Sequence, residues 1–148
     1  MKKAILIFLT LMMTAAFGAT WATSADAYKY ITAEDLNTRL GKGSPMILVD
    51  ICSVEQFAKG HIEGSLETNA YPVKTEAEKA RLAKHLPTLK ASTDDVIIVC
   101  PRGGGGAKKT VDFYQANGIE ANRILILEKG MDKWPFQTSQ NKCENTAA

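Results

Sequence analysis

One cysteine, Cys100, stands where the sequence could do covalent chemistry, because an apolar run precedes it and a glycine-rich stretch follows it. The segment over residues 96–107 reads Val-Ile-Ile-Val-Cys-Pro-Arg-Gly-Gly-Gly-Gly-Ala. Glycine allows backbone conformations in which several N–H groups converge on one point and bind an anion. Such a nest stabilises a cysteine sulfur as the nucleophilic thiolate. We therefore predict that Cys100 is a nucleophile, held by a substrate-binding loop that consists of Pro101, Arg102, Gly103, Gly104, Gly105 and Gly106.

The segments on either side of this loop would position the sulfur. Residues 96–99 are apolar and predict a central strand, whose carboxyl end is where parallel sheets place their ligands. Residues 107–117 predict a helix, and a helix N-terminus carries roughly half a positive charge. The alternative is an ordinary buried cysteine followed by a flexible connection. Four successive glycines favour the nucleophile, since such a run is costly unless the backbone needs it.

Short apolar runs alternate with longer periodic segments along the rest of the chain, which is typical of an α/β domain. Capping residues and period-3.6 patterns predict helices, and apolar runs predict strands. The helices are expected over residues 33–40, 54–59 and 75–86, with a turn or short helix at 131–136, and the other strands over residues 46–51, 66–71 and 124–127.

Three ordered motifs carry a resemblance to a known family. Residues 49–65 read Val-Asp-Ile-Cys-Ser-Val-Glu-Gln-Phe-Ala-Lys-Gly-His-Ile-Glu-Gly-Ser, which resembles the entry motif of rhodanese domains. In that motif a strand ends in Asp, and a short Glu-x-[Phe/Tyr] helix leads to Gly-His-Ile-x-Gly. The family's catalytic cysteine follows at a later strand end, as Cys100 does, and residues 128–134 resemble its closing Gly-Gly-x-x-x-Trp motif. The chain is similar to single-domain rhodaneses over residues 31–136.

The resemblance implies a fold and a reaction. The fold is a doubly wound α/β domain with about five mainly parallel strands flanked by helices. The reaction is that of a sulfurtransferase (EC 2.8.1 class), which moves a sulfane sulfur from thiosulfate, polysulfide or a persulfide to a thiol or cyanide acceptor. The sulfur carrier is Cys100 as a persulfide, and no cofactor is needed. No metal is expected either, because the spacing of the cysteines and histidines resembles no zinc site.

The loop departs from its relatives in ways that concern the sulfur donor. Many relatives carry Arg near the end of the loop, where this chain has Gly105 and Gly106, and Pro101 removes one N–H from the nest. Arg102 is the only cation in the loop, and Lys108 lies just inside the following helix. Either could attract an anionic donor, or both could be solvated charges without substrate contact. Thiosulfate, polysulfide and a protein persulfide therefore all remain candidate donors.

Asp50 and Cys52 are auxiliary candidates. The family usually has Arg where this chain has Cys52, and adjacent strands could bring this thiol near Cys100. Cys52 could then resolve the persulfide or form a protective disulfide with Cys100. It could also pair with Cys143 or remain a packed free thiol. Asp50 resembles the acid beside the family's active-site entrance, and we expect it to organise the loop backbone rather than to transfer protons.

Two other functions compete with this one. The first is a carrier that binds polysulfide sulfur and hands it to a periplasmic or membrane reductase, with little turnover of its own. The second is a phosphatase or arsenate reductase, because related folds use a cysteine and a phosphate-cradling loop. The loops of those enzymes typically end in Arg, whose planar fork binds an oxyanion in two places, and here glycine stands at that position.

The N-terminus predicts export. Lys2 and Lys3 precede an apolar stretch over residues 4–17, which is shorter than the roughly 20 residues of a membrane span. Ala25 and Ala27 have the spacing that signal peptidase requires. We predict a signal peptide over residues 1–27, cleaved after Ala27, and a periplasmic location; the alternative is an uncleaved anchor. Residues 28–148 then form a single domain, with a loose polar tail from about residue 137.

The composition limits the partners. The formal net charge is +2 for 148 residues, which is too small to indicate nucleic acid or an anionic membrane as the main partner. The expected partners are small sulfur anions, a protein persulfide, and a periplasmic or membrane protein of sulfur metabolism.

Overall fold

The chain is seen here as a computed structural model that describes residues 28–140. The predicted signal peptide and Cys143 lie outside the described residues. Within the described part of the chain, no helix combines the length and the apolar character needed to cross a membrane.

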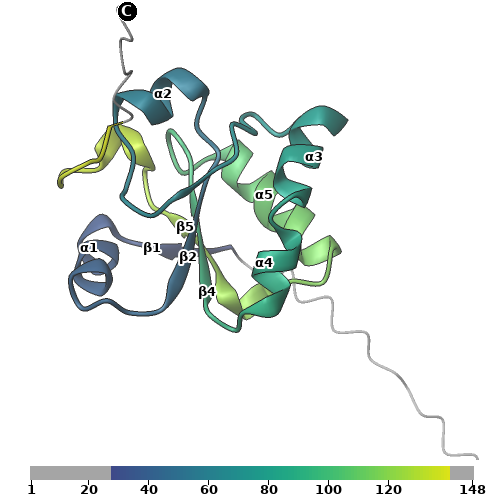
Figure 1. The fold of residues 1–148 in the computed structure, drawn as a ribbon, viewed down its shortest axis with the longest axis horizontal. Helices are drawn as coiled ribbons and strands as arrows, with labels where there is room; N and C mark the ends of the chain where they lie inside the picture. The colour runs from purple at the N-terminus through teal and green to yellow at the C-terminus, as the bar shows by residue number, and fades with distance from the viewer. Residues whose placement is uncertain (1–27, 141–148) are drawn as a thin grey trace, which may run out of the picture.

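A five-stranded parallel sheet with the order β1-β5-β4-β2-β3 forms the centre of the domain. Each of the four residues from Val96 to Val99 in the central strand β4 is completely buried, because helices cover both faces of the sheet. The predicted doubly wound architecture is confirmed (Figure 1). The strands are β1 (Lys29–Ile31), β2 (Met46–Asp50), β3 (Leu66–Glu67), β4 (Asp95–Val99) and β5 (Ile124–Leu127).

Helix α1 covers one face of the sheet, whereas α3, α4 and α5 cover the other face (Figure 1). Three of the helices begin at hydroxyl side chains that accept a backbone N–H of the first turn, which fixes where each helix starts. These caps are Thr32, Ser53 and Thr75. The helices are α1 (Ala33–Gly41), α2 (Val54–Lys59), α3 (Glu76–Ala83), α4 (Leu86–Ala91) and α5 (Gly105–Ala116), with short 3-10 turns η1 (Ala121–Arg123) and η2 (Met131–Lys133).

Three elements differ from the sequence prediction. The edge strand β1 has no predicted counterpart, because only Ile31 of its three residues is buried. The strand expected over residues 66–71 is confined to Leu66–Glu67. The helix expected over residues 75–86 ends at Ala83, and α4 starts afresh at Leu86. Pro87 in the first turn of α4 explains this break, because proline has no N–H to donate to the Ala83 carbonyl and its ring would clash with that carbonyl in a continuous helix.

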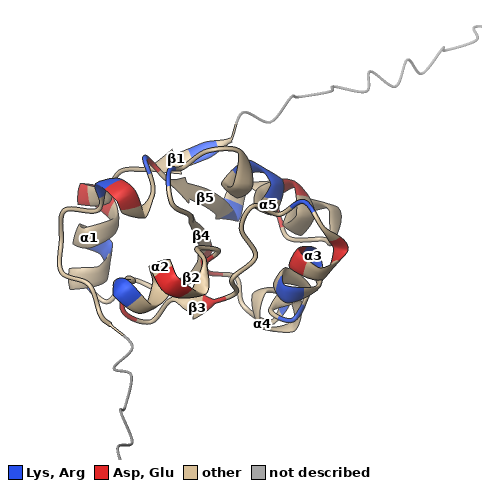
Figure 2. Cartoon of the chain, turned by 90° about the horizontal axis from the view of Figure 1, so that it is seen from above, with Lys and Arg blue, Asp and Glu red and all other residues tan. Residues whose placement is uncertain are grey.

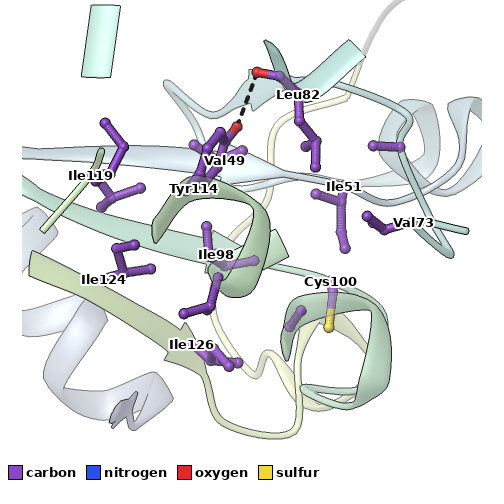
Figure 3. Packing of buried hydrophobic residues seen from close by; sticks show 14 of the residues in the cluster. Val49, Ile51, Val73, Leu82, Ile98, Cys100, Tyr114, Ile119, Ile124 and Ile126 are labelled. Carbon is purple, nitrogen blue, oxygen red and sulfur yellow. Dashed lines mark hydrogen bonds between the residues drawn. The ribbon is translucent and has the colours of Figure 1, made fainter. Parts of the chain in front are cut away.

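Two hydrophobic clusters lie on opposite faces of the sheet, as the period-2 alternation of strand side chains requires. Ile97 and Val99 belong to the cluster on the α1 side, and Ile98 and Cys100 to the cluster on the side of α3, α4 and α5. Figure 3 shows this second group, in which the hydroxyl of Tyr114 donates to the Leu82 carbonyl at 3.4 Å. Cys100 thus continues the buried face of β4 toward α5.

The C-terminal segment is held against the domain farther than the sequence indicates. The backbone of Ser139 pairs with that of His61 in both directions, with N···O distances of 3.0 and 2.8 Å. Nδ1 of the His61 ring lies 2.9 Å from the Phe57 carbonyl, and the ring stacks on the Phe57 ring at 3.9 Å. The tail predicted to be loose from about residue 137 is therefore paired with the domain as far as Ser139.

Candidate active site

Cys100 lies directly after β4, at the carboxyl edge of the sheet. Its Sγ accepts a hydrogen bond from the backbone N–H of Gly103 at 2.9 Å. Gly103 has a φ of 67°, in the left-handed region that favours glycine, and this conformation turns its N–H back toward the sulfur. The loop thus closes on the sulfur by its main chain, with no side chain required.

The N-terminus of α5 follows the loop immediately. The helix begins at Gly105, and no side chain caps it. The first N–H groups of an α-helix have no partner within the helix, and they form the positive end of its dipole. Cys100, Gly103 and the start of α5 are therefore brought together, in an arrangement that can hold a negatively charged sulfur.

The segment after β5 supports the loop from the other side. The N–H of Met131 donates to the Cys100 carbonyl at 2.9 Å, and the N–H of Asp132 donates to the Pro101 carbonyl at 2.9 Å. Gly130 packs so closely that a Cβ at this position would lie 2.1 Å from the Cys100 carbonyl oxygen. This support comes from the region of the closing motif, although the sequence does not indicate which residue makes the contact.

The four loop glycines have two different environments. A Cβ at Gly103 would lie 2.7 Å from the backbone nitrogen of Lys129, and a Cβ at Gly106 would lie 2.8 Å from Cδ2 of the Tyr71 ring. A Cβ at Gly104 or Gly105 would meet no atom within 4 Å. Only the first and last glycines of the run are therefore required by close packing.

Arg102 is exposed and lies at the rim of the loop. Its Nη2 donates to the Tyr71 hydroxyl at 3.3 Å. This hydrogen bond, together with the nearby Asp132 and Cys100, raises the pKa of Arg102 further, so the guanidinium keeps its charge. Arg102 therefore supplies an exposed positive charge at the rim of the loop.

Lys108 is not brought to the sulfur. Its Nζ lies 5.3 Å from the centroid of the Tyr28 ring, in a cation–π contact. The Tyr28 hydroxyl donates to Asp112 at 2.9 Å, so Lys108 belongs to a mixed surface cluster on α5. Lys and Arg are interspersed with Asp and Glu over the helices in Figure 2. This contact gives no support to the hypothesis that Lys108 attracts the donor, which stays a prediction.

Asp50 is 1% exposed, and its Oδ1 accepts the backbone N–H of Cys52 at 2.8 Å. The side chain thus organises the backbone where the chain leaves β2. Its Oδ2 is buried and has no hydrogen-bond partner among residues 28–140. Burial raises the pKa of this carboxyl above its ordinary value, and the bond from Cys52 and the nearby His61 oppose the shift only in part.

We expect Asp50 to make the stability of the protein depend on pH. Because its pKa is raised from 3.8, the folded protein binds a proton here more readily than the unfolded chain does. The free energy of unfolding should therefore fall as the pH rises from that value through the raised pKa. Asp50→Asn should lose this part of the pH dependence. Urea unfolding at several pH values between about 4 and 7 gives the free energy of unfolding of both proteins. The same dependence on pH in the two proteins would contradict the prediction.

Among residues 28–140, Cys52 and Cys100 are both buried free thiols, and their surroundings differ. Cys52 lines a pocket of about 280 Å³ together with Met131 and Trp134, which pack against the cluster on the α1 side, whereas Cys100 belongs to the opposite cluster. Burial and the neighbouring carboxyl of Asp50 raise the pKa of the Cys52 thiol, so this side chain is protonated at neutral pH. A resolving thiol must attack as a thiolate, so this environment does not favour that role for Cys52.

Tyr71 is the site residue that sequence reasoning missed. The sequence predicts it as the end of a strand, whereas the structure places its ring over Gly106 and its hydroxyl beside Arg102. Contacts between residues more than thirty positions apart leave no periodic pattern, so no local signal could have shown this one.

A model of the family described as "Rhodanese-like domain" matches residues 32–135. None of the curated proteins searched matches the chain significantly. Among solved structures, the rhodanese-like domain of an Anabaena protein is 17% identical, with a TM-score of 0.56, over 82% of this chain and 86% of its own. A rhodanese-like domain protein from Staphylococcus aureus is 25% identical, with a TM-score of 0.55, over 76% of this chain and 98% of its own.

The fold is also shared by a protein of another described activity. The As-Sb reductase from Leishmania major is 16% identical, with a TM-score of 0.57, over 73% of this chain and 77% of its own. At this identity the likeness shows the fold alone. The chemistry of the site must therefore be argued from its residues.

Proposed function

Because the chain belongs to the rhodanese-like domain family, we propose that it is a sulfurtransferase that carries a sulfane sulfur on Cys100 as a persulfide. The observation that carries this proposal is the hydrogen bond of 2.9 Å from the Gly103 N–H to the Cys100 Sγ, beside the uncapped start of α5. These groups favour a negative charge on the sulfur, and the outer sulfur of a persulfide carries the same charge.

The reaction consists of two balanced displacements at sulfur. With thiosulfate, the Cys100 thiolate attacks the sulfane sulfur, the S–S bond of the donor breaks, and sulfite leaves with the bonding electron pair. With polysulfide, a chain shorter by one sulfur leaves instead. In the second step a thiolate or cyanide attacks the outer sulfur of the persulfide, and Cys100 returns to a thiolate. No net proton transfer is needed, in keeping with a site whose nearest buried acid, Asp50, is bound to backbone.

An oxyanion reaction is less well supported by the residues of the loop. Bidentate binding of phosphate or arsenate uses a planar guanidinium, and the loop ends in Gly105 and Gly106. The single loop cation, Arg102, is bonded to Tyr71 at the rim. This arrangement suits the attraction of an anion better than the clamping of three oxygens.

We also propose that the protein is exported and works in the periplasm, with a periplasmic or membrane protein of sulfur metabolism as donor or acceptor. The support is the charge, length and small-residue pattern of residues 1–27. N-terminal sequencing of the protein isolated from its own cells tests the cleavage, and a chain that begins at Tyr28 is expected.

Intact mass spectrometry after treatment with thiosulfate or polysulfide tests the sulfur chemistry. A gain of about 32 Da, one sulfur atom, mapped to the Cys100 peptide is expected. Continuous formation of thiocyanate in the presence of cyanide indicates an enzyme, whereas stoichiometric loading without turnover indicates a carrier. Absence of the mass gain with every donor would overturn both.

Arg102→Gln should weaken the use of thiosulfate more than it slows the chemical step. Loss of one exposed cation at the rim is expected to raise the KM for thiosulfate about two- to fivefold, with a smaller change in kcat. Lys108→Gln is the matched control, because that ammonium lies over Tyr28. Steady-state kinetics at low ionic strength measures both, and equal effects of the two variants would contradict the assignment.

A further inference from the structure

The sulfur of Cys100 is closed off in the structure, since the residue is only 1% exposed. Displacement at sulfur requires a donor to approach along the line of the breaking bond, so part of the surrounding structure must move. The backbone on two sides of the sulfur is tied down by Gly103 and by Met131. The Tyr71 side chain, which packs against the cluster that contains Cys100, is only partly buried.

We propose that the Tyr71 side chain is a gate over Cys100, latched by Arg102, that opens preferentially to anionic sulfur donors. The inference rests on the proposed function, because it assigns control of access to the same sulfur.

The movement is assigned to the ring rather than to the backbone. The N–H of Tyr71 donates to the Ile51 carbonyl at 2.8 Å, and the neighbouring Ala70 and Val73 are 0% and 3% exposed. Asn69 and Val73 have φ angles of 52° and 59°, which non-glycine residues adopt only when their surroundings hold them there. A fixed backbone leaves rotation of the side chain as the available motion, and partly exposed side chains rotate within nanoseconds.

The latch is the hydrogen bond of 3.3 Å from Arg102 Nη2 to the Tyr71 hydroxyl. This bond joins a charged donor to a neutral acceptor, and a guanidinium binds an anionic acceptor more strongly. Thiosulfate or polysulfide would therefore compete with the phenol for Arg102 and release the ring. A neutral reagent has no such advantage, so the gate should discriminate by charge.

The Tyr71 ring packs directly against the backbone of Gly106. A Cβ at this position would lie 2.8 and 2.9 Å from Cδ2 and Cε2 of Tyr71, closer than van der Waals contact allows. Gly106→Ala should therefore push the ring outward without any change to Tyr71 itself. This gives a second and independent way to open the gate.

The experiment measures alkylation of Cys100, in which the sulfur displaces iodide and forms a thioether. Iodoacetamide and iodoacetate have nearly the same shape and differ in charge, and peptide mass spectrometry separates Cys100 from Cys52. Tyr71→Ala and Gly106→Ala are expected to raise the iodoacetamide rate about tenfold. Tyr71→Phe, which keeps the ring and loses the latch, should give an intermediate rate. In the wild-type protein, Arg102 should raise the alkylation rate with iodoacetate relative to that with iodoacetamide. Arg102→Gln should lose this preference for the anionic reagent.

The controls are the same two kinds of substitution, Tyr→Ala and Gly→Ala, at positions away from the site. Tyr30→Ala removes an exposed ring on β1, and Gly41→Ala adds a methyl group in open space at the end of α1. Both should alkylate at the wild-type rate. Wild-type rates in Tyr71→Ala and Gly106→Ala would overturn the gate, and Gly106→Ala with Tyr71→Phe decide the question if Tyr71→Ala fails to fold. Alkylation needs no sulfur transfer, so a wild-type protein that never gains 32 Da would sink the proposed function alone.

Discussion

Cys100→Ser is expected to abolish the gain of one sulfur atom and to lower thiocyanate formation about a thousandfold or more. A serine hydroxyl is not ionised by a few hydrogen-bond donors, and it forms no persulfide. The substitution is nearly isosteric, so the loop and the bond from the Gly103 N–H should persist. Intact mass spectrometry and initial rates with cyanide measure the two effects.

The informative control for this variant is Cys52→Ser. Within the described residues Cys52 is a buried free thiol whose pKa is raised by burial and by Asp50, and it lines a pocket with Met131 and Trp134. Loading of Cys100 should therefore survive Cys52→Ser. A sulfur retained in Cys100→Ser and mapped to Cys52 would show that the wrong thiol has been assigned. Slower recovery of the free thiol in Cys52→Ser would instead restore the resolving role.

Gly130→Ala is expected to destabilise the fold by about 3 kcal/mol or more and to impair sulfur loading as well. Gly130 has a φ of 60°, and an added Cβ would lie 2.1 Å from the Cys100 carbonyl oxygen and 2.6 Å from the Arg102 nitrogen. Because these neighbours are backbone atoms, relief requires movement of the loop itself. Urea unfolding and the extent of the 32 Da gain measure the two consequences.

Gly118→Ala separates the contact from the backbone conformation. Gly118 also has a positive φ, 88°, but a Cβ there would meet no atom within 4 Å. Its substitution should cost about 1–2 kcal/mol from the left-handed conformation alone and leave loading unchanged. Equal losses of stability in the two variants would mean that the close approach of Gly130 to Cys100 is unimportant.

The elements that could be predicted well are those whose own residues determine them, through an apolar run or through capping residues. Strand β4 is a run of buried apolar residues, and α2 starts at a Ser53 capping box and ends at Gly60. Strand β1 lacked such a cause, because Lys29 and Tyr30 are exposed and its place is set by pairing with β5. The division of the helix predicted over residues 75–86 follows from Pro87, which cannot donate the i−4 hydrogen bond that would continue the helix past Ala83.

The features of the site likewise differ in whether the sequence could predict them. The order of strand, cysteine, glycines and helix could be predicted, because chain connectivity alone keeps these parts together. The contact of Lys108 with Tyr28 and that of Tyr71 with Gly106 join distant segments and could not. The placement of Cys100 could also be predicted, because the alternation of side chains along β4 puts Ile98 and Cys100 in one cluster and Ile97 and Val99 in the other.

The open space at Gly105 indicates how one fold could support different reactions. A longer side chain could be introduced there without disturbing the turn at Gly103, because nothing lies within 4 Å of the position that a Cβ would take. A guanidinium at this place would offer paired N–H groups to a tetrahedral oxyanion. A single substitution in the loop would then separate the proposed sulfur transfer from oxyanion binding, with the sheet, the nucleophile and the helix start unchanged.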